Sequence, residues 1–141
     1  MPLKEPVDPK DAYILVVEDN LQNAMLIARL LDRIGVCHYE WKSSGWELMD
    51  LADTMPRVDL VLLDLNLPLE NGYEILARLR NDCRFANTQV IAVTGDSDPA
   101  SMDKAREAGF DGFLGKPIVV SKFPDQIADI LQGKPVWKLG R

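Results

Sequence analysis

Residues 60–72 read Leu60-Val61-Leu62-Leu63-Asp64-Leu65-Asn66-Leu67-Pro68-Leu69-Glu70-Asn71-Gly72, and this stretch decides the fold. Its first four residues form an apolar run without polar alternation, which is typical of a strand buried on both faces. The run ends on Asp64, and the Pro, Asn and Gly that follow favour turns. We therefore predict a central strand with Asp64 at its carboxyl end, where open α/β sheets bind ligands. An isolated Asp at such a position is more often a simple turn or cap residue, so its partners decide its meaning.

Strands and helices alternate along the rest of the chain. Further strands are predicted at residues 13–17, 36–41, 89–94 and 112–115, and helices at 21–34, 46–53, 73–81, 99–108 and 121–131. This alternation calls for a parallel sheet covered on both faces, with right-handed crossovers. The second strand alternates polar and apolar residues and the fifth is short, so we expect both at the edges of the sheet. The expected fold is α/β, a doubly wound, flavodoxin-like sheet of five parallel strands in the order 2-1-3-4-5.

The length of 141 residues fits one domain with a core of ordinary size. Residues 1–11 are polar and contain three prolines, which predicts a flexible lead-in. The domain is expected to span residues 12–131, followed by a basic C-terminal tail at 132–141. We expect Trp137 of this tail to pack against the domain, because an exposed Trp is unfavourable; the alternative is a docking tail for a partner.

Composition limits the kinds of partner and compartment. The net charge of -6 argues against direct binding of nucleic acid or of an anionic membrane, which is achieved mainly through Lys and Arg. No signal peptide or membrane-spanning run is visible, so we expect a cytoplasmic protein without membrane insertion. Cys37 and Cys83 form no CxxC pair and are expected to be free, mostly buried thiols in a reducing compartment. For His38, the only histidine, ordinary packing or solvent exposure is expected.

Functional-looking polar side chains gather at the carboxyl ends of the predicted strands. Separately each has a simpler role, because acids cap helices, Thr is common in strands and Lys usually coats a surface. Together they form an acidic cup with one hydroxyl and one ammonium group. Its members are Glu18 and Asp19 after the first strand, Asp64 after the third, Thr94 after the fourth and Lys116 after the fifth.

Three neighbouring carboxylates repel, so either their pKa values rise or a hard cation joins them. Mg2+ suits a small number of oxygen ligands and keeps its other positions for water or a substrate phosphate. A phosphoryl group on Asp64 would complete such a shell, and Thr94 and Lys116 could donate hydrogen bonds to its remaining oxygens. The pattern indicates a carboxylate nucleophile with its metal and its counter-charges.

These motifs, in this order, resemble those of the response-regulator receiver domain of two-component signalling. The resemblance covers about residues 12–131, nearly the whole chain. Any one motif is weak, but each lies at the end of a predicted strand. They are Glu18-Asp19, Asp64 with the eight residues after it, Thr94-Gly95, and Phe113-Leu114-Gly115-Lys116-Pro117.

The resemblance implies that Asp64 is the phospho-acceptor, receiving a phosphoryl group from a histidine kinase or a histidine phosphotransfer protein. It implies that Mg2+ is bound by Asp64, by Asp19 directly and by Glu18 through water. The backbone carbonyl of Asn66 would be a further ligand.

Switching residues are also implied by the resemblance. Thr94 would move toward the phosphoryl group, and Lys116 would pair with its oxygens. Phe113 would be the aromatic switch that turns inward, and the Lys116–Pro117 peptide would be cis. The family position of Phe113 often holds Tyr, so this switch lacks a hydroxyl and is expected to be softer. Glu18 in place of Asp is expected to adjust only how the metal-bound water is held.

The helix at 99–108 has few large inward side chains, with Met102, Ala105 and Ala108 expected on its inner face. Such an element has low stability and suits a switch. We expect the face formed by the fourth helix, the fifth strand and the fifth helix to change its binding of an unknown downstream protein. The chain is expected to be a monomer or weak dimer, and not an enzyme beyond its own phosphorylation and dephosphorylation.

Two other functions compete with this one. The first is a phosphorylation-independent pseudo-receiver that acts as a protein-interaction module, against which the complete set of acids, Thr and Lys argues. The second is a haloacid-dehalogenase-like phosphatase with Asp64 as nucleophile. Such enzymes need a second acid two residues after the nucleophile, and Asn66 occupies that position.

Overall fold

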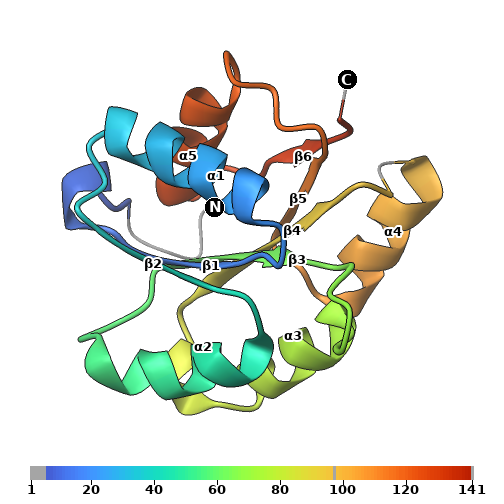
Figure 1. Ribbon diagram of the computed structural model, residues 1–141, viewed down its shortest axis with the longest axis horizontal. Coiled ribbons are helices and arrows are strands. Elements are labelled where there is room, and N and C mark those ends of the chain that lie inside the picture. Colours follow the sequence, from blue (N-terminus) through green and yellow to red (C-terminus); the bar gives the residue numbers. More distant parts are fainter. Residues whose placement is uncertain (1–5, 97, 141) are drawn as a thin grey trace.

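A six-stranded sheet in the order β2-β1-β3-β4-β5-β6 runs through the middle of the computed structural model, which describes residues 6–96 and 98–140 (Figure 1). Every neighbouring pair of strands is parallel. The strands are β1 (Tyr13–Val17), β2 (His38–Lys42), β3 (Leu60–Asp64), β4 (Gln89–Thr94), β5 (Gly112–Gly115) and β6 (Trp137–Lys138). The α-helices are α1 (Leu21–Arg33), α2 (Gly45–Leu51), α3 (Gly72–Arg80), α4 (Pro99–Ala108) and α5 (Phe123–Leu131).

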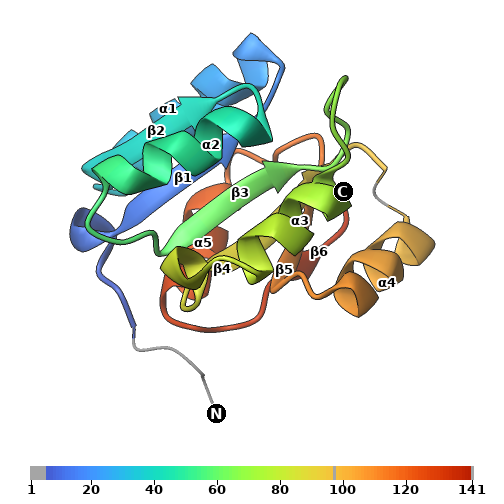
Figure 2. The same cartoon turned by 90° about the horizontal axis from the view of Figure 1, so that it is seen from below.

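Helices cover both faces of the sheet, with α1 and α5 on one side and α2, α3 and α4 on the other (Figures 1 and 2). Two apolar clusters fill the spaces between these layers, one on each face. Because β3 lies between both clusters, all five of its residues are buried, including Asp64. The doubly wound fold and the order of the first five strands are therefore confirmed.

The outer side of β5 is covered by an additional strand that the sequence reasoning did not predict. β6 pairs with β5 along its outer side, so the prediction that the fifth strand lies at an edge is wrong, whereas β2 does lie at an edge. The pairing arises because the chain turns back after α5 and Phe113 N–H donates to the carbonyl of Val136 at 2.9 Å. Trp137 is half-buried against the core, which confirms the expected packing of this side chain.

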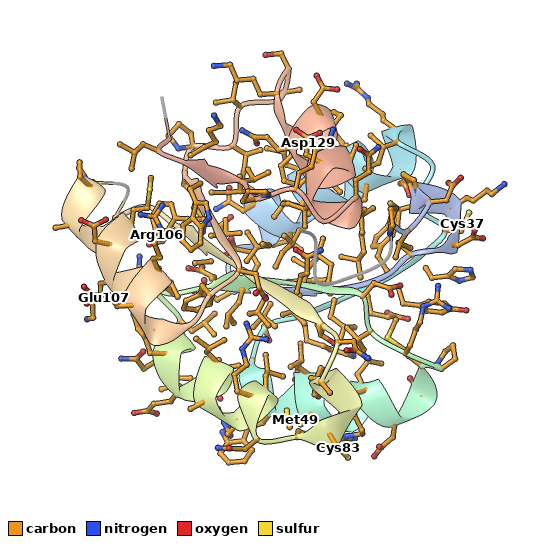
Figure 3. All side chains as sticks on the ribbon, turned by 180° about the vertical axis from the view of Figure 1, so that it is seen from behind. Cys37, Met49, Cys83, Arg106, Glu107 and Asp129 are labelled. Atoms are coloured by element: carbon orange, nitrogen blue, oxygen red, sulfur yellow. The ribbon has the colours of Figure 1, made fainter. Side chains whose placement is uncertain are left out.

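Several local expectations need correction. Both cysteines are free but exposed, at the periphery of the molecule (Figure 3), so the expectation of mostly buried thiols is wrong. Cys37 lies in the turn after α1 and Cys83 begins a 3-10 turn after α3, where neither can reach a core cluster. In α4, Ala105 is buried but Ala108 is exposed, because the helix ends there on Gly109 in a left-handed conformation.

The remaining expectations concern the start of the chain and the histidine. Residues 1–5 of the expected flexible lead-in lie outside the described residues. The part that is described is attached to the domain, since Val7 N–H donates to the Leu131 carbonyl at 2.8 Å and residues 9–11 form a 3-10 turn. His38 is exposed and stacks on Tyr13, with ring centroids 4.5 Å apart, so packing and solvent exposure both apply. No helix in the described ranges is long and apolar enough to cross a membrane.

Candidate functional site

The strand-end residues singled out above lie together at the carboxyl edge of the sheet. The strand register brings their backbones side by side, because Val17 aligns with Leu63, Asp64 with Val93 and Thr94 with Gly115. In a parallel sheet the carboxyl ends of all strands lie at the same edge, so motifs that are far apart in the sequence become neighbours there.

Asp64 is the central carboxylate of this group and only 3% exposed. Its Oδ1 accepts a hydrogen bond from the backbone N–H of Asn66 at 2.8 Å. Its Oδ2 accepts one from Lys116 Nζ at 3.1 Å. The turn after β3 and the ammonium group therefore fix this carboxylate from two sides.

Glu18 is the most deeply buried acid of the site, with 1% of its surface exposed. Its Oε2 accepts a hydrogen bond from Asn20 N–H at 3.1 Å, and its Oε1 lies 2.7 Å from Lys116 Nζ. Burial, together with the neighbouring Asp64 carboxylate, raises the pKa of Glu18 to about 7, although Lys116 and the Asn20 N–H act in the opposite direction. The surroundings of Glu18 therefore favour its neutral, protonated form over the charged carboxylate.

Lys116 joins the two buried acids. Burial by itself would lower the pKa of its ammonium group, but contacts with Glu18 and Asp64 outweigh this effect and the pKa is raised. The Lys116 backbone N–H donates to the Thr94 carbonyl at 2.7 Å, which fastens the end of β5 to β4. The Lys116–Pro117 peptide is cis, as the resemblance implied.

Thr94 is fully buried and reaches Asp64 through Asn66. The Thr94 hydroxyl oxygen accepts hydrogen bonds from Asn66 Nδ2 at 3.0 Å and from the Asp96 N–H at 3.1 Å. Sequence reasoning gave Asn66 a backbone role toward the metal and a place close to the phosphoryl group, but it did not predict the hydrogen bond from its side chain to Thr94. The side-chain bridge depends on the turn bringing Asn66 toward β4, and the sequence carries no direct signal for it.

Asp19 is exposed, and one oxygen from each of Glu18, Asp19 and Asp64 lies within 4.8 Å of the others. A group of hard carboxylate oxygens at this spacing fits a small divalent cation such as Mg2+. Glu18 Oε1 supports the fit, because it is a buried carboxylate oxygen whose only close counter-charge among the described residues is Lys116 Nζ, at 2.7 Å. The donor set and its geometry are therefore compatible with the expected metal.

Two further residues complete the surroundings. Phe113, expected to switch between outward and inward positions, is fully buried among the side chains between the sheet and helices α2 to α4. Trp41, at the end of β2, donates from Nε1 to the backbone carbonyl of Glu18 at 2.6 Å. Sequence reasoning missed Trp41, and its only signal was a large aromatic close to the end of an edge strand.

The sequence profile of the response regulator receiver domain matches residues 14–128 of this chain. The chain belongs to the response-regulator receiver family. Receivers are signalling domains rather than conventional enzymes, and the acidic residues of this chain form a pocket that could hold a metal ion. The recognition made from the motifs is confirmed.

Relatives of this receiver include both short and long proteins. It is 33% identical over 120 residues to the polar-differentiation response regulator DivK of Brucella anthropi, covering 84% of this chain and 94% of DivK. It is 30% identical over 123 residues to the two-component response regulator ARR3 of Arabidopsis thaliana, covering 80% of this chain but only 53% of ARR3. The receiver thus spans about half of the longer relative.

Solved structures show the same fold. The chemotaxis response regulator CheY4 of Vibrio cholerae superposes with a TM-score of 0.76 at 22% identity, covering 84% of this chain and 98% of CheY4. The receiver domain of the sensor histidine kinase PA1611 from Pseudomonas aeruginosa superposes with a TM-score of 0.74 at 25% identity, covering 87% of this chain and 98% of the PA1611 domain. That structure has a magnesium ion coordinated in its active-site cleft.

Proposed function

We propose that Asp64 accepts a phosphoryl group from a phosphohistidine of a histidine kinase or histidine phosphotransfer protein. The observation that carries this proposal is the pairing of buried Asp64 with Lys116 Nζ at 3.1 Å, beside the second buried acid Glu18. An oxygen of the Asp64 carboxylate attacks phosphorus, and the P–N bond to the donor imidazole breaks. The imidazole leaves with the electron pair of that bond and takes up a proton from solvent.

The acids around Asp64 are proposed to hold Mg2+, in line with their fit to a hard cation. Asp19 and Asp64 would supply carboxylate oxygens directly, Glu18 would act through a bound water molecule, and Asn66 would supply its backbone carbonyl. When bound, the ion neutralises carboxylate charge and charge on the phosphoryl oxygens, which favours their approach. The magnesium bound in the cleft of the PA1611 receiver domain supports this assignment.

Lys116 and Thr94 are proposed to stabilise the transferred group. Lys116 Nζ already lies between the two buried acids, within reach of charge that develops beside Asp64. The Thr94 hydroxyl is linked to the Asp64 turn through Asn66 and would donate a hydrogen bond to a phosphoryl oxygen. Preorganised donors of this kind accelerate phosphoryl transfer because they need little rearrangement during the reaction.

A phosphoryl donor of protein size needs a docking surface, and exposed apolar side chains occur on the elements next to the cup. Leu21 and Met25 are exposed on α1, which begins directly after the acidic pair. Leu69 is 95% exposed in the loop after Asp64, and Val120 is exposed in the loop after β5. We expect a histidine kinase or phosphotransfer protein to bind across these residues, because they lie on elements that border the cup.

The proposal is tested by incubating the chain with acetyl phosphate and Mg2+ and following the intact mass. We expect one phosphoryl adduct that is stable in acid, labile to hydroxylamine and abolished by EDTA. Asp64→Asn should remove it, whereas Asp50→Asn, at an exposed acid on α2, should not. Absence of an adduct would favour the pseudo-receiver. Continuous release of phosphate from many phosphate esters would favour the hydrolase.

A further inference from the structure

The C-terminal tail, residues 132–140, covers the side of β5 that would otherwise be the edge of the sheet. β6 aligns Trp137 with Phe113 and Lys138 with Leu114, and it lies beside β5 between α5 and α4 (Figure 1). The backbones approach closely, because a Cβ atom on Gly112 would lie 2.6 Å from the Val136 carbonyl oxygen. This approach requires glycine at position 112, so the tail occupies a place shaped to receive it.

Side chains of the tail insert into both layers of the molecule. Val136 is buried in the cluster beneath α1 and α5, whereas Trp137 and Leu139 pack on the cluster beneath α2, α3 and α4. The guanidinium carbon of Arg106, on α4, lies 4.5 Å from the centroid of the Trp137 ring. The tail is thus fastened to the helix expected to move on activation.

The end of the tail contacts the backbone of the site. A Cβ atom on Gly140 would overlap the carbonyl group of Lys116 and lie 2.9 Å from the carbonyl carbon of Gly115. On its other side, Lys116 is fastened to Thr94 by the 2.7 Å backbone hydrogen bond. The Lys116 backbone therefore cannot move toward the docked tail without displacing Gly140.

Phosphoryl transfer to Asp64 would require such a shift. Lys116 Nζ contacts Glu18 Oε1 and Asp64 Oδ2. The metal and the phosphoryl group would bind at these two carboxylates and so displace the ammonium group. Phe113, three residues earlier, is fully buried, and its register partner Trp137 lies on the same face of the sheet. Because the tail contacts β5 at Phe113 and at Lys116, any movement of this strand acts on the tail at two points.

We propose that the tail is the output element of this receiver: it docks on β5 while Asp64 is unmodified and is released when a phosphoryl group occupies the site. This inference rests on the proposed function of Asp64. Release would expose Val136 and Trp137, which lie between the basic residues Lys134 and Lys138, and Leu139, which follows Lys138. A segment of this chemistry fits a partner with an apolar groove and an acidic rim, and the vacated edge of β5 becomes available at the same time.

Coupling of two equilibria is reciprocal, so it is observable from either end. If site occupancy weakens docking of the tail, a substitution that undocks the tail must strengthen occupancy of the site. Gly140→Val is the variant of choice, because it blocks the contact with Lys116 without changing the core or the cup. Lys138→Ala is the matched control, since Lys138 is exposed on the same strand.

The experiment uses the full chain with Mg2+ and fluoroberyllate, an inorganic analogue of the phosphoryl group. Fluorine NMR reports occupancy of the site, and amide hydrogen exchange reports docking at Phe113 and at residues 137–139. With fluoroberyllate bound, we expect exchange at these amides to become at least tenfold faster. Gly140→Val should show fast exchange without the analogue and bind it several-fold more tightly, whereas Lys138→Ala should match the parent chain.

Two results would overturn the inference separately from the proposed function. Bound fluoroberyllate with unchanged exchange at Phe113 would show that the tail does not respond to the site. Equal affinity of Gly140→Val and the parent chain would show that docking and occupancy are not coupled, provided that exchange confirms undocking in the variant. If fluoroberyllate fails to bind at all, the proposed function fails, and this inference fails with it.

Discussion

The indole N–H of Trp41 donates a 2.6 Å hydrogen bond to the backbone carbonyl of Glu18, so an edge strand positions the acidic pair of the site. That carbonyl belongs to the peptide linking Glu18 to Asp19, and its orientation decides where the exposed Asp19 carboxylate lies. The register of β1 and β2 brings Trp41 opposite Val16, two residues before Glu18. Trp41 is therefore a positioning residue rather than a ligand.

Trp41→Phe should weaken Mg2+ binding by about two- to tenfold, the range that follows from losing one hydrogen bond of about 0.5–1.5 kcal/mol. The variant keeps an aromatic ring on β2 and loses only the donor. Isothermal titration calorimetry gives the Mg2+ affinity, and thermal unfolding in EDTA shows whether the fold is intact. Trp46→Phe, at an exposed Trp on α2, is the control. Equal Mg2+ affinity of both variants would rule out the positioning role.

Much of this arrangement could be predicted from the sequence. Apolar runs in β1, β3 and β4 indicate strands buried on both faces, and parallel strands must bring their ends together. Asp64, Thr94 and Lys116 could therefore be placed at one site before any contact was known. The local chemistry of each strand end carries this information.

The parts that could not be predicted depend on tertiary contacts. β6 contains only two residues, too few for a periodic pattern that could be recognised in the sequence. Its pairing with β5 depends instead on the close approach of Gly112 to the Val136 carbonyl. The Asn66–Thr94 hydrogen bond likewise depends on how a turn closes over the neighbouring strand. Cys37 looked like a core residue by type, but the turn after α1 leaves it exposed. Residue type alone does not encode such positions.

Metal-free protein should lose stability as the pH rises from about 4.5 to about 7, the interval between the ordinary pKa of Glu18 and its raised value. Over this interval the folded state holds a proton that the unfolded state releases, so the free energy of unfolding falls with rising pH. Above pH 7 Glu18 is ionised in both states, and the free-energy cost of burying its charge in the folded state is fully present. Glu18→Gln should therefore stabilise the metal-free chain at pH 8, by up to about 3 kcal/mol.

Urea unfolding in EDTA at pH 5 and pH 8 measures this effect. Glu18→Gln should flatten the pH dependence between these values, whereas Glu74→Gln, at an exposed acid on α3, should preserve it. Addition of Mg2+ at pH 8 should stabilise the parent chain more than Glu18→Gln, because binding to the folded state adds to stability. An unchanged pH profile in Glu18→Gln would contradict the assignment of the titration to this residue.

Lys116→Met should destabilise metal-free protein at pH 8 by about 2–4 kcal/mol, because it leaves the buried acids Glu18 and Asp64 without their counter-charge. Mg2+ should restore most of this loss by supplying the missing positive charge. Denaturant unfolding with and without Mg2+ checks both statements. Lys122→Met, at an exposed position before α5, should show neither effect. A loss that Mg2+ leaves unchanged would mean that Lys116 acts through packing rather than charge.

Asn66→Ala should strengthen binding of fluoroberyllate, by about two- to tenfold, since Thr94 must leave its hydrogen bond with Asn66 Nδ2 to reach a phosphoryl oxygen. The substitution removes the donor that holds the Thr94 oxygen in its present position, so the hydroxyl can move toward the ligand without breaking this hydrogen bond. The affinity for Mg2+ alone should stay unchanged, because Ala keeps the backbone carbonyl proposed as a ligand. Fluorine NMR titration at fixed Mg2+ measures the first quantity and calorimetry the second. Asn81→Ala, at an exposed Asn after α3, is the control. Weaker fluoroberyllate binding by Asn66→Ala would show that the Asn66 side chain stabilises the bound state instead of opposing it.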